Sequence, residues 1–344
     1  MNVTPATHPA EWDAFLRSQS FSPFLQSWTM GEVFRDIGQE PIRLEVRENG
    51  VIVGICLAIV VPARRGRHLM VQYGPVASSE NVMKNMIDAL HGAAREHRCS
   101  FLRISPFLPA ESALTIDGAV QSPLHLLAEH LWYLPLTGLT EEQILMGMRK
   151  TTRNLIRRAE KEGVTIELSK DPITDLSHFI ALHDETRKRH KFTPYTNSFF
   201  RSQVQQFAES GAVLLYLARF QGQVIASSIH MQFGGETSYH HGASSAAFSK
   251  IPASYLLQWQ AIKDALHRGD HLYNFWGIAP VTRDPETDTY RPITKTHPFS
   301  GVTLFKTGFG GTLLNLQHCF DIPITRSYHL TRIFEIVRKW RRGF

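Results

Sequence analysis

The chain has 344 residues, of which 43% are hydrophobic and 20% are charged, and its formal net charge is +6. This length suits two ordinary domains better than one, and the hydrophobic content excludes a disordered chain or a small disulfide-stapled protein. The positive balance favours an anionic partner, such as nucleic acid, a nucleotide-linked substrate or an anionic membrane face, although solubility alone could account for it.

Three cysteines, an odd number without a CxxC pair, argue against a disulfide framework and for a reducing cytosol: Cys56, Cys99 and Cys319. Residues 1–5 lack the charged and apolar regions of a signal peptide, and the best apolar run, 51–62, is too short to cross a bilayer. We therefore expect a cytoplasmic protein. The 17 histidines include neither HExxH nor a His/Cys ligand spacing, so no metal site is predicted.

The first half of the chain predicts two helices, then strands, a long amphipathic helix and further strands. The helices are expected at 9–19, 26–37 and 81–97, and the strands at 42–47, 51–61, 68–73, 101–105 and 131–136. Pro106 ends the fourth strand, and a loop is expected at 112–124.

The second half opens with Thr140 followed by two acids, which is a helix-capping signal. The helical pattern runs to Gly163 and is expected to break near Lys150. Beyond it we predict strands at 164–168, 212–219, 223–233, 237–241 and 272–276, helices at 175–188, 197–209 and 253–267, a polar loop at 279–300 and a final helix at 326–341.

The order of elements occurs twice. Residues 47–54 and 219–226 both read as a hairpin with a Gly-containing turn, and the two turn glycines, Gly50 and Gly222, are separated by close to half the chain. Each hairpin follows two helical stretches and precedes a strand, a long helix and an apolar strand. We therefore predict two similar domains at 1–147 and 148–317, packed tightly because no linker separates them, with a junction where a site could form. A C-terminal helix within 318–344 is expected to pack on the first domain.

A stripe of cations is the strongest electrostatic feature. Lys150, Arg153, Arg157 and Lys161 recur at helical spacing and share one face, which suits a phosphate backbone or a diphosphate. A solvated helix face is the competing interpretation. A second basic run, 187–191, ends a helix, where cations also favour the macrodipole.

Lys306 lies among apolar residues and glycines. Burying an ammonium without a partner is costly, so we expect an anionic partner such as a substrate phosphate or a developing oxyanion. A lysine that reaches the surface from an edge strand is the alternative. His240 and His241 are adjacent on a predicted strand, so their rings should face opposite sides and serve packing instead of metal binding.

The C-terminal helix is amphipathic and basic. Ile333, Phe334, Val337 and Trp340 lie on one side, with arginines and lysines mostly on the other. Such a helix can lie on an anionic membrane surface. Packing on its own domain is the more common arrangement and is what we expect.

Together these segments resemble the FemABX (Fem-type) aminoacyltransferases of peptidoglycan bridge formation, along nearly the whole chain. The resemblance rests on the order and spacing of loose motifs, which are Gln26-Ser27-Trp28, Tyr73-Gly74-Pro75-Val76, Leu102 to Pro106, Met148 to Arg157, His241 to Ser245, Tyr255 to Trp259, Tyr273 to Ile278 and Leu304-Phe305-Lys306. It implies an α/β (α+β) chain of two tandem GNAT-like domains, in the short form without a coiled-coil arm.

The resemblance implies transfer of an amino acid from aminoacyl-tRNA to the stem-peptide amine of a peptidoglycan precursor, either lipid II or UDP-MurNAc-pentapeptide. No cofactor is then needed, because aminoacyl-tRNA is the co-substrate. The family's Phe-Lys pair falls on Phe305 and Lys306. Lys306 would stabilise charge on the reacting ester, since an ordinary lysine is a poor base unless desolvated. The stripe would meet tRNA or precursor phosphates. We expect a monomer that could touch the inner membrane face peripherally.

The acceptor-binding positions implied by the family are only partly kept. The substrate-binding residues it implies are Phe305, Arg35, Arg189, Tyr195, Tyr239 and His241. Arg35 stands beside the aligned position, which is Phe34, and Ser105 replaces an aspartate. The acceptor could therefore be lipid-linked, differently modified or not a cell-wall precursor.

The main alternative is a GNAT-type N-acyltransferase that uses acyl-CoA. Its pyrophosphate loop, Q/R-x-x-G-x-G/A at a helix N-terminus, has no good copy, since Arg219 to Gly222 lies in a predicted hairpin. Two further alternatives are a non-enzymatic scaffold on tRNA or membrane and transfer from aminoacyl-tRNA to a protein N-terminus. The sequence does not name the amino acid that is moved.

Overall fold

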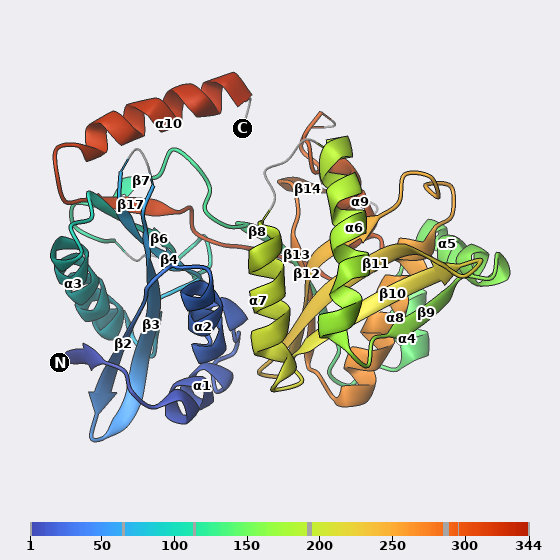
Figure 1. The fold of residues 1–344 in the computed structure, drawn as a ribbon, viewed down its shortest axis with the longest axis horizontal. Coiled ribbons are helices and arrows are strands. Elements are labelled where there is room, and N and C mark those ends of the chain that lie inside the picture. The colour runs from blue at the N-terminus through green and yellow to red at the C-terminus, as the bar shows by residue number, and fades with distance from the viewer. Residues whose placement is uncertain are drawn as a thin grey trace. The chain divides into compact units, whose positions relative to one another are not determined.

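The computed structural model describes residues 2–63, 66–112, 115–190, 195–284, 289–294 and 296–342. It divides into two compact units, which Figure 1 shows as ribbons. Unit 1 contains Met1–Glu129 and Asn315–Phe344, and unit 2 contains His130–Leu314. In the part of the chain that the structure describes, no helix is long and apolar enough to cross a bilayer.

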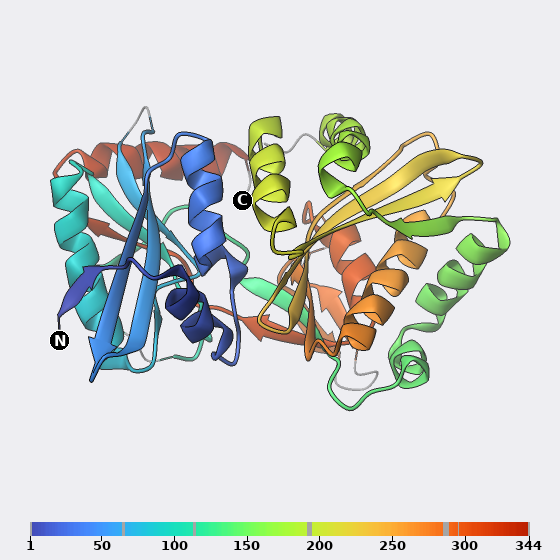
Figure 2. The same ribbon diagram turned by 60° about the horizontal axis from the view of Figure 1, so that its bottom comes forward.

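Unit 1 is a mixed sheet with helices on both faces. Its strands are β1 (Val3–Pro5), β2 (Pro41–Glu48), β3 (Val51–Val61), β4 (His68–Gln72), β5 (Val76–Ala77), β6 (Phe101–Ser105), β7 (Val120–Gln121) and β17 (Phe320–Pro323), in the order β1-β2-β3-β4-β6-β17-β7, with β5 on β3. Its helices are α1 (Pro9–Arg17), the short 3-10 turn η1 (Phe24–Gln26), α2 (Trp28–Asp36), α3 (Glu80–Glu96) and α10 (Tyr328–Arg342). Figure 2 shows α3 on one face of this sheet and α1 and α2 on the other.

Unit 2 has the same layers. Its main sheet has the order β16-β8-β13-β12-β11-β10-β9, made of β8 (His130–Pro135), β9 (Thr165–Leu168), β10 (Val213–Phe220), β11 (Gln223–Phe233), β12 (Glu236–Ser244), β13 (Leu272–Gly277) and β16 (Thr312–Asn315). The helices are α4 (Glu141–Gly147), α5 (Lys150–Lys161), α6 (Pro172–His190), α7 (Asn197–Ala208), α8 (Ala253–Arg268) and α9 (Ser300–Thr307). In Figure 2, α6 and α7 cover one face and α8 the other.

The predicted repeat extends to backbone detail. The turn Asn49-Gly50 has φ values of 51° and 82°, and Gln221-Gly222 has 51° and 79°, so both are hairpin turns with two left-handed central residues. Each hairpin also contains a register shift, between Val46 and Arg47 in the first copy and between Ala218 and Arg219 in the second. The two register shifts have the same spacing along the chain as the two turns, which indicates two copies of one fold.

The unit boundary differs from the predicted one at 147. The strand that closes the first half, β8, belongs to unit 2, where it pairs antiparallel with β13. The equivalent position beside β6 in unit 1 is filled by β17 from the C-terminal segment. The two units therefore exchange their last strands. Backbone pairing of β8 with β13 carries 130–147 into unit 2, including α4 with its capping box at Thr140.

The polar stretch predicted as a loop at 279–300 contains a small hairpin, β14 (Val281–Asp284) with β15 (Thr289–Pro292). It leads into α9, whose residues Thr303, Lys306 and Thr307 are buried. Lys306 therefore lies on a helix, and the alternative that placed it on an edge strand is wrong. The predicted break of the helical pattern near Lys150 is confirmed by the separate helices α4 and α5.

Candidate active site

The candidate site begins where two neighbouring strands of unit 2 stop pairing. β12 and β13 run parallel and pair only at Glu236, Thr237 and Ser238 with residues 272–274. Beyond this point β12 carries a bulge, because Ile229 pairs with His241 while the next residue of β11 pairs with Tyr239. The matching parallel strands of unit 1, β4 and β6, pair at five positions. The parallel strands of unit 2 therefore separate at a point where the matching strands of unit 1 remain paired.

Lys306 links the two diverging strands. Its Nζ donates a hydrogen bond of 2.7 Å to the carbonyl oxygen of Gly277, the last residue of β13. The same Nζ lies 5.6 Å from the centroid of the Tyr239 ring on β12. The residue before Gly277, Trp276, has a φ of 67°, and its N–H donates to the side-chain oxygen of Asn274 at 2.7 Å. Lys306, only 6% exposed, is therefore held by a strained backbone segment.

The surroundings favour the neutral form of this lysine. Burial lowers the pKa of Lys306 to about 7, because an ammonium loses its hydration there. Its contacts within the described residues are a carbonyl and an aromatic face, and no anionic partner for it lies among those residues. Burial also raises the pKa of Tyr239 to about 12, and burial together with Lys306 lowers that of His240 to about 3. At neutral pH the amine is thus divided between both protonation states.

His240 and His241 do not face opposite sides as predicted. Their ring centroids are 3.9 Å apart, because the bulge in β12 breaks the alternation of side chains. His241 meets the ring of Tyr195 at 5.4 Å, and Tyr195 stacks on Phe199 at 4.4 Å. The pKa of His241 is far below its usual value because of burial. Aromatic rings from β12 and the start of α7 therefore form one cluster.

Glycine is required beside this cluster. A Cβ at Gly242 would collide with the hydroxyl of Tyr239, so the ring can lie against β12 only because Gly242 has no side chain. The predicted substrate-binding positions of unit 2 are partly brought together. Tyr239 lies beside Lys306, and the rings of Tyr195 and His241 contact each other. The side chain of Arg189, in α6, lies outside the described residues.

One buried polar group of unit 2 was missed by the sequence reasoning. Gln203 on α7 is fully buried, yet neither atom of its side-chain amide has a hydrogen-bond partner among the described residues. The same holds for Nε2 of His241. A buried unpaired amide costs free energy and is available to a ligand. A glutamine at helical spacing from Phe199, Phe200 and Phe207 was the signal that could have revealed it.

Phe305 and Arg149 fix the helix that carries Lys306. The Phe305 ring packs against Tyr255 at 4.8 Å and against Phe309 at 5.3 Å, within the core of unit 2. Arg149, which precedes α5, donates to the carbonyl of Leu304 at 3.3 Å and to the hydroxyl of Thr307. Phe305, predicted to bind substrate, thus also has a structural role. The sequence analysis gave Arg149 no role of its own.

The cationic stripe is divided by the structure. Arg153 is half-buried, and its Nη1 donates to the carbonyls of Met146 at 2.9 Å and Met148 at 2.6 Å, so it helps to hold the end of α4. Lys150, Arg157 and Lys161 are exposed and make no ion pair or hydrogen bond within the described part of the chain. Of the four cations of the predicted stripe, three are therefore exposed and unpaired among the described residues.

Arg35 lies in unit 1, on α2. It forms an ion pair with Glu32, which also binds the guanidinium of Arg43 at 2.7 Å. Trp28, Arg35 and Arg43 line a shallow hollow of about 540 Å³. A hollow of about 570 Å³ on unit 2, between β9, β10 and α8, contains none of the predicted site residues. Arg35 is therefore an exposed cation beside this hollow, and Glu32 offsets part of its charge.

Comparisons with known proteins agree with this architecture. A family model described as the FemAB family matches residues 7–131, and one described as an acetyltransferase (GNAT) domain matches 146–285. Aminoacyltransferase FemA of Staphylococcus aureus (strain MRSA252) is 21% identical, with 93% of this chain and 94% of that protein aligned.

Solved structures share the fold. A crystal structure of FemX superposes with a TM-score of 0.81 at 18% identity, covering 97% of this chain and 100% of that one. A tandem GNAT protein from the clavulanic acid biosynthesis pathway gives 0.56 at 12% identity, covering 94% and 98%. The chain is therefore an acyltransferase with the fold of two tandem GNAT domains, and it is similar to the Fem-type aminoacyltransferases along nearly its whole length.

Proposed function

We propose that this acyltransferase moves an aminoacyl group from aminoacyl-tRNA to the stem-peptide amine of a peptidoglycan precursor. The single observation that supports this most is Lys306, a buried amine with a pKa of about 7, beside the opened strands β12 and β13 of unit 2. The FemA relatives, which are named as aminoacyltransferases, support the same class of reaction.

The reaction needs little covalent chemistry from the protein. The acceptor amine attacks the ester carbonyl, a C–N bond forms, and the carbonyl oxygen becomes an oxyanion. The C–O bond to the ribose then breaks, and the proton lost by the amine ends on the ribose oxygen. The protonated form of Lys306, which is buried, can donate to the oxyanion. Its neutral form can accept the proton of the amine, a role that an ordinary lysine could not fill near neutral pH.

The loop before α8 argues against the acyl-CoA alternative. GNAT enzymes that use CoA hold the pyrophosphate with free backbone N–H groups at this helix N-terminus. Here the N–H of Ala246 donates to a carboxylate oxygen of Glu185 at 2.6 Å, and the hydroxyl of Ser245 donates to the same oxygen at 3.3 Å. The N-cap is Pro252, which has no N–H. A pyrophosphate would have to displace a carboxylate and overcome its repulsion.

The two anionic substrates have candidate surfaces on this chain. The three exposed cations of α5 suit the phosphates of tRNA, whose counterions they would release. Arg35 and the hollow around it in unit 1 suit the phosphates of a precursor, either lipid II or UDP-MurNAc-pentapeptide. We expect the enzyme to work as a monomer without a further cofactor.

Transfer from charged tRNA tests the proposal. The purified protein is incubated with labelled aminoacyl-tRNA and either lipid II or UDP-MurNAc-pentapeptide, and the product is identified by mass spectrometry. RNase treatment should abolish transfer, and Lys306→Ala should reduce it strongly at normal folding, whereas exposed Lys250→Ala should not. Transfer from acetyl-CoA without tRNA would support the alternative and refute the proposal.

A further inference from the structure

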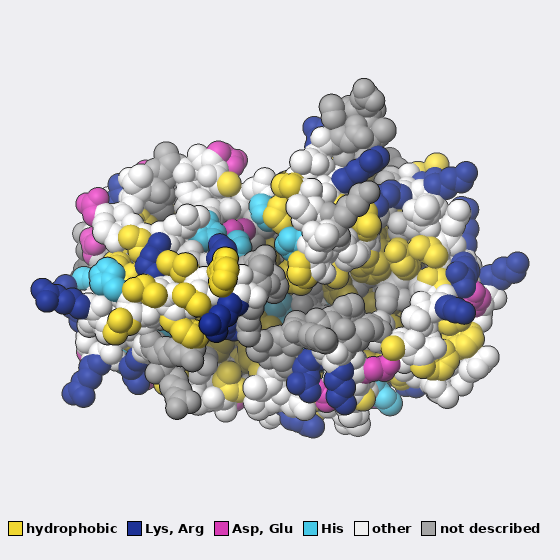
Figure 3. All heavy atoms as spheres, turned by 90° about the horizontal axis from the view of Figure 1, so that it is seen from above, with side chains coloured by type: hydrophobic (Ala, Val, Ile, Leu, Met, Phe, Trp, Pro, Cys, Tyr) yellow, Lys and Arg dark blue, Asp and Glu magenta, His cyan; other side chains and the backbone are white. Residues whose placement is uncertain are grey.

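The C-terminal helix of unit 1 presents an apolar row to solvent. Five large hydrophobic side chains of α10 are exposed, namely Leu330 (73%), Ile333 (60%), Ile336 (48%), Val337 (40%) and Trp340 (82%). At 100° per residue they form one stripe along the helix. Figure 3 shows hydrophobic side chains gathered on this side of unit 1, with lysine and arginine beside them. The C-terminal helix belongs to unit 1, as expected, but this apolar row is not what it turns toward that unit.

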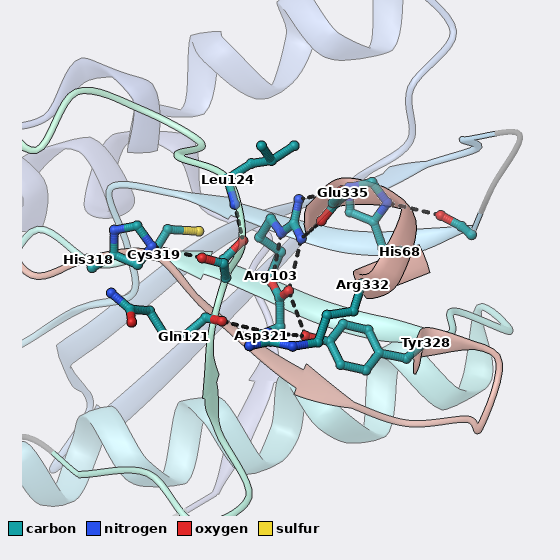
Figure 4. A network of polar contacts seen from close by, with 12 residues as sticks. His68, Arg103, Gln121, Leu124, His318, Cys319, Asp321, Tyr328, Arg332 and Glu335 are labelled. Carbon is teal, nitrogen blue, oxygen red and sulfur yellow. Dashed lines mark hydrogen bonds and ion pairs between the residues drawn. The ribbon is translucent and has the colours of Figure 1, made fainter. Parts of the chain in front are cut away.

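Polar contacts with the sheet of unit 1 fix the orientation of α10, so that its apolar row remains exposed. Buried Arg103 on β6 forms a bidentate pair with Asp321, at 2.7 and 2.8 Å, and a second with Glu335 of α10, at 3.1 and 2.7 Å. The hydroxyl of Tyr328 donates to Asp321 at 2.9 Å, and Arg332 donates to the carbonyl of Gln121 at 2.6 Å. Figure 4 shows these side chains meeting between α10 and the sheet. The inward face of α10 is thus its polar face.

The polar network resists rotation of the helix. Burial disfavours the charged guanidinium of Arg103, but hydrogen bonds and charge from Asp321 and Glu335 outweigh this and raise its pKa. Rolling α10 to bury its apolar row would leave Arg103 without Glu335. A buried charge that loses its partner is strongly destabilised. The apolar stripe is therefore held outward by the fold and is not a loosely attached tail.

Cations border the stripe on both sides. On a helical projection, Arg332 and Lys339 lie along the edge next to Ile336, and Arg338 and Arg341 lie along the opposite edge. Lys339 and Arg341 are exposed, and with Arg338 they form no ion pair in the described part of the chain. An apolar stripe between two cationic borders, with a tryptophan near its end, is the pattern of helices that lie in a membrane interface.

We propose that α10 is a docking helix that binds the surface of a membrane containing anionic lipids. The apolar stripe would enter the boundary between headgroups and acyl chains, and the bordering cations would meet lipid phosphates. A second copy of this chain fits less well, because pairing two stripes would bring their cationic borders together. The inference deepens the proposed function, since a lipid-linked acceptor is presented at such a surface, but vesicle binding can be measured without any transfer.

Vesicle flotation tests the docking helix. The full chain, without substrates, is mixed with vesicles of phosphatidylcholine alone or of phosphatidylcholine with phosphatidylglycerol, at low and high salt. We expect binding to the anionic vesicles, weakened about fivefold for each cation removed in Arg338→Gln and Lys339→Gln. Ile333→Glu should weaken it at least about tenfold. Ile173→Glu is the matched control, because Ile173 is also exposed (53%) but lies in unit 2.

Several outcomes would overturn the inference. These are equal binding to both vesicle types, unchanged binding of Ile333→Glu, or an equal loss in Ile173→Glu. A dimer in light scattering that Ile333→Glu dissociates would assign the stripe to a second copy. If Ile333→Glu does not fold, Trp340→Ala replaces it, because its side chain is 82% exposed. Lys306→Ala should bind vesicles like the parent, so a failure of transfer and a failure of docking remain separate results.

Discussion

Replacing Lys306 by methionine should stabilise the protein at acidic pH while it removes activity. The folded chain holds the Lys306 proton with a pKa of about 7, against 10.5 for an ordinary lysine. The unfolded state therefore binds more protons between these values, and stability rises with pH across that window. The cost of burying the amine is fully present below the folded pKa and vanishes above the unfolded one.

The magnitude follows from the two pKa values. At about 1.4 kcal/mol per pKa unit, burying Lys306 costs the fold about 5 kcal/mol at pH 6 and roughly 1 kcal/mol at pH 10. Methionine removes this cost but also leaves the Gly277 carbonyl without its hydrogen bond, which costs about 1–3 kcal/mol. Lys306→Met should therefore be about 2–4 kcal/mol more stable than the parent at pH 6, and no more stable at pH 10.

Urea unfolding of both proteins at pH 6, 8 and 10 measures this difference, and comparison at equal pH cancels the titration of other groups. Lys250→Met is the control, since it makes the same change at an exposed lysine. A constant difference for Lys306→Met would refute the reasoning, because it would mean that the amine is solvated in the folded state and has an ordinary pKa.

Three further predictions concern other parts of the chain. Arg157→Ala with Lys161→Ala should reduce the salt slope of tRNA binding by about 2, as filter binding at several salt concentrations would show, and an unchanged slope would assign these cations to solvent. His318→Ala should cost about 1.5–3 kcal/mol near pH 5.5. That loss should shrink in urea unfolding as the pH rises through the folded-state pKa of His318, which Glu129 raises above the ordinary 6.5, because this stabilisation disappears once the imidazolium deprotonates. Gly242→Ala should lower transfer at least about tenfold without preventing folding, since the new Cβ displaces the tyrosine ring beneath the reactive amine; normal kinetics would contradict this.

Local patterns predicted much of the fold. The hairpins at Gly50 and Gly222, the long helices that follow, and the cap at Thr140 depend on residues close in sequence, so their signals are visible in a single chain. The strand exchange was not predictable in this way. Whether β8 pairs with β6 or β13 is decided by competition between distant edges, and the apolar pattern of residues 131–136 satisfies both.

In the candidate site, too, features with a local sequence signal were predictable, and features that depend on distant residues or on a bulge were not. Lys306 stands out by its chemistry, because a lysine among glycines and apolar residues predicts burial. The meeting of His240 with His241 depends on one bulge, which reverses an alternation that the sequence suggests. The exposure of the apolar face of α10 depends on Arg103, which is distant in the sequence. Because buried Arg103 pairs with Glu335, the side of the helix that carries Glu335 faces the sheet.

The strand exchange has a consequence for synthesis on the ribosome. Unit 2 is one continuous stretch, so its whole chain is available once residue 314 has emerged. Unit 1 is made first but must wait for β17, and until then the edge of β6 presents unpaired backbone groups. A chain truncated before residue 315 would contain a finished second domain joined to an open-edged first one. Closure of the first domain by β17 and formation of α10 therefore both depend on a segment that is synthesised after unit 2.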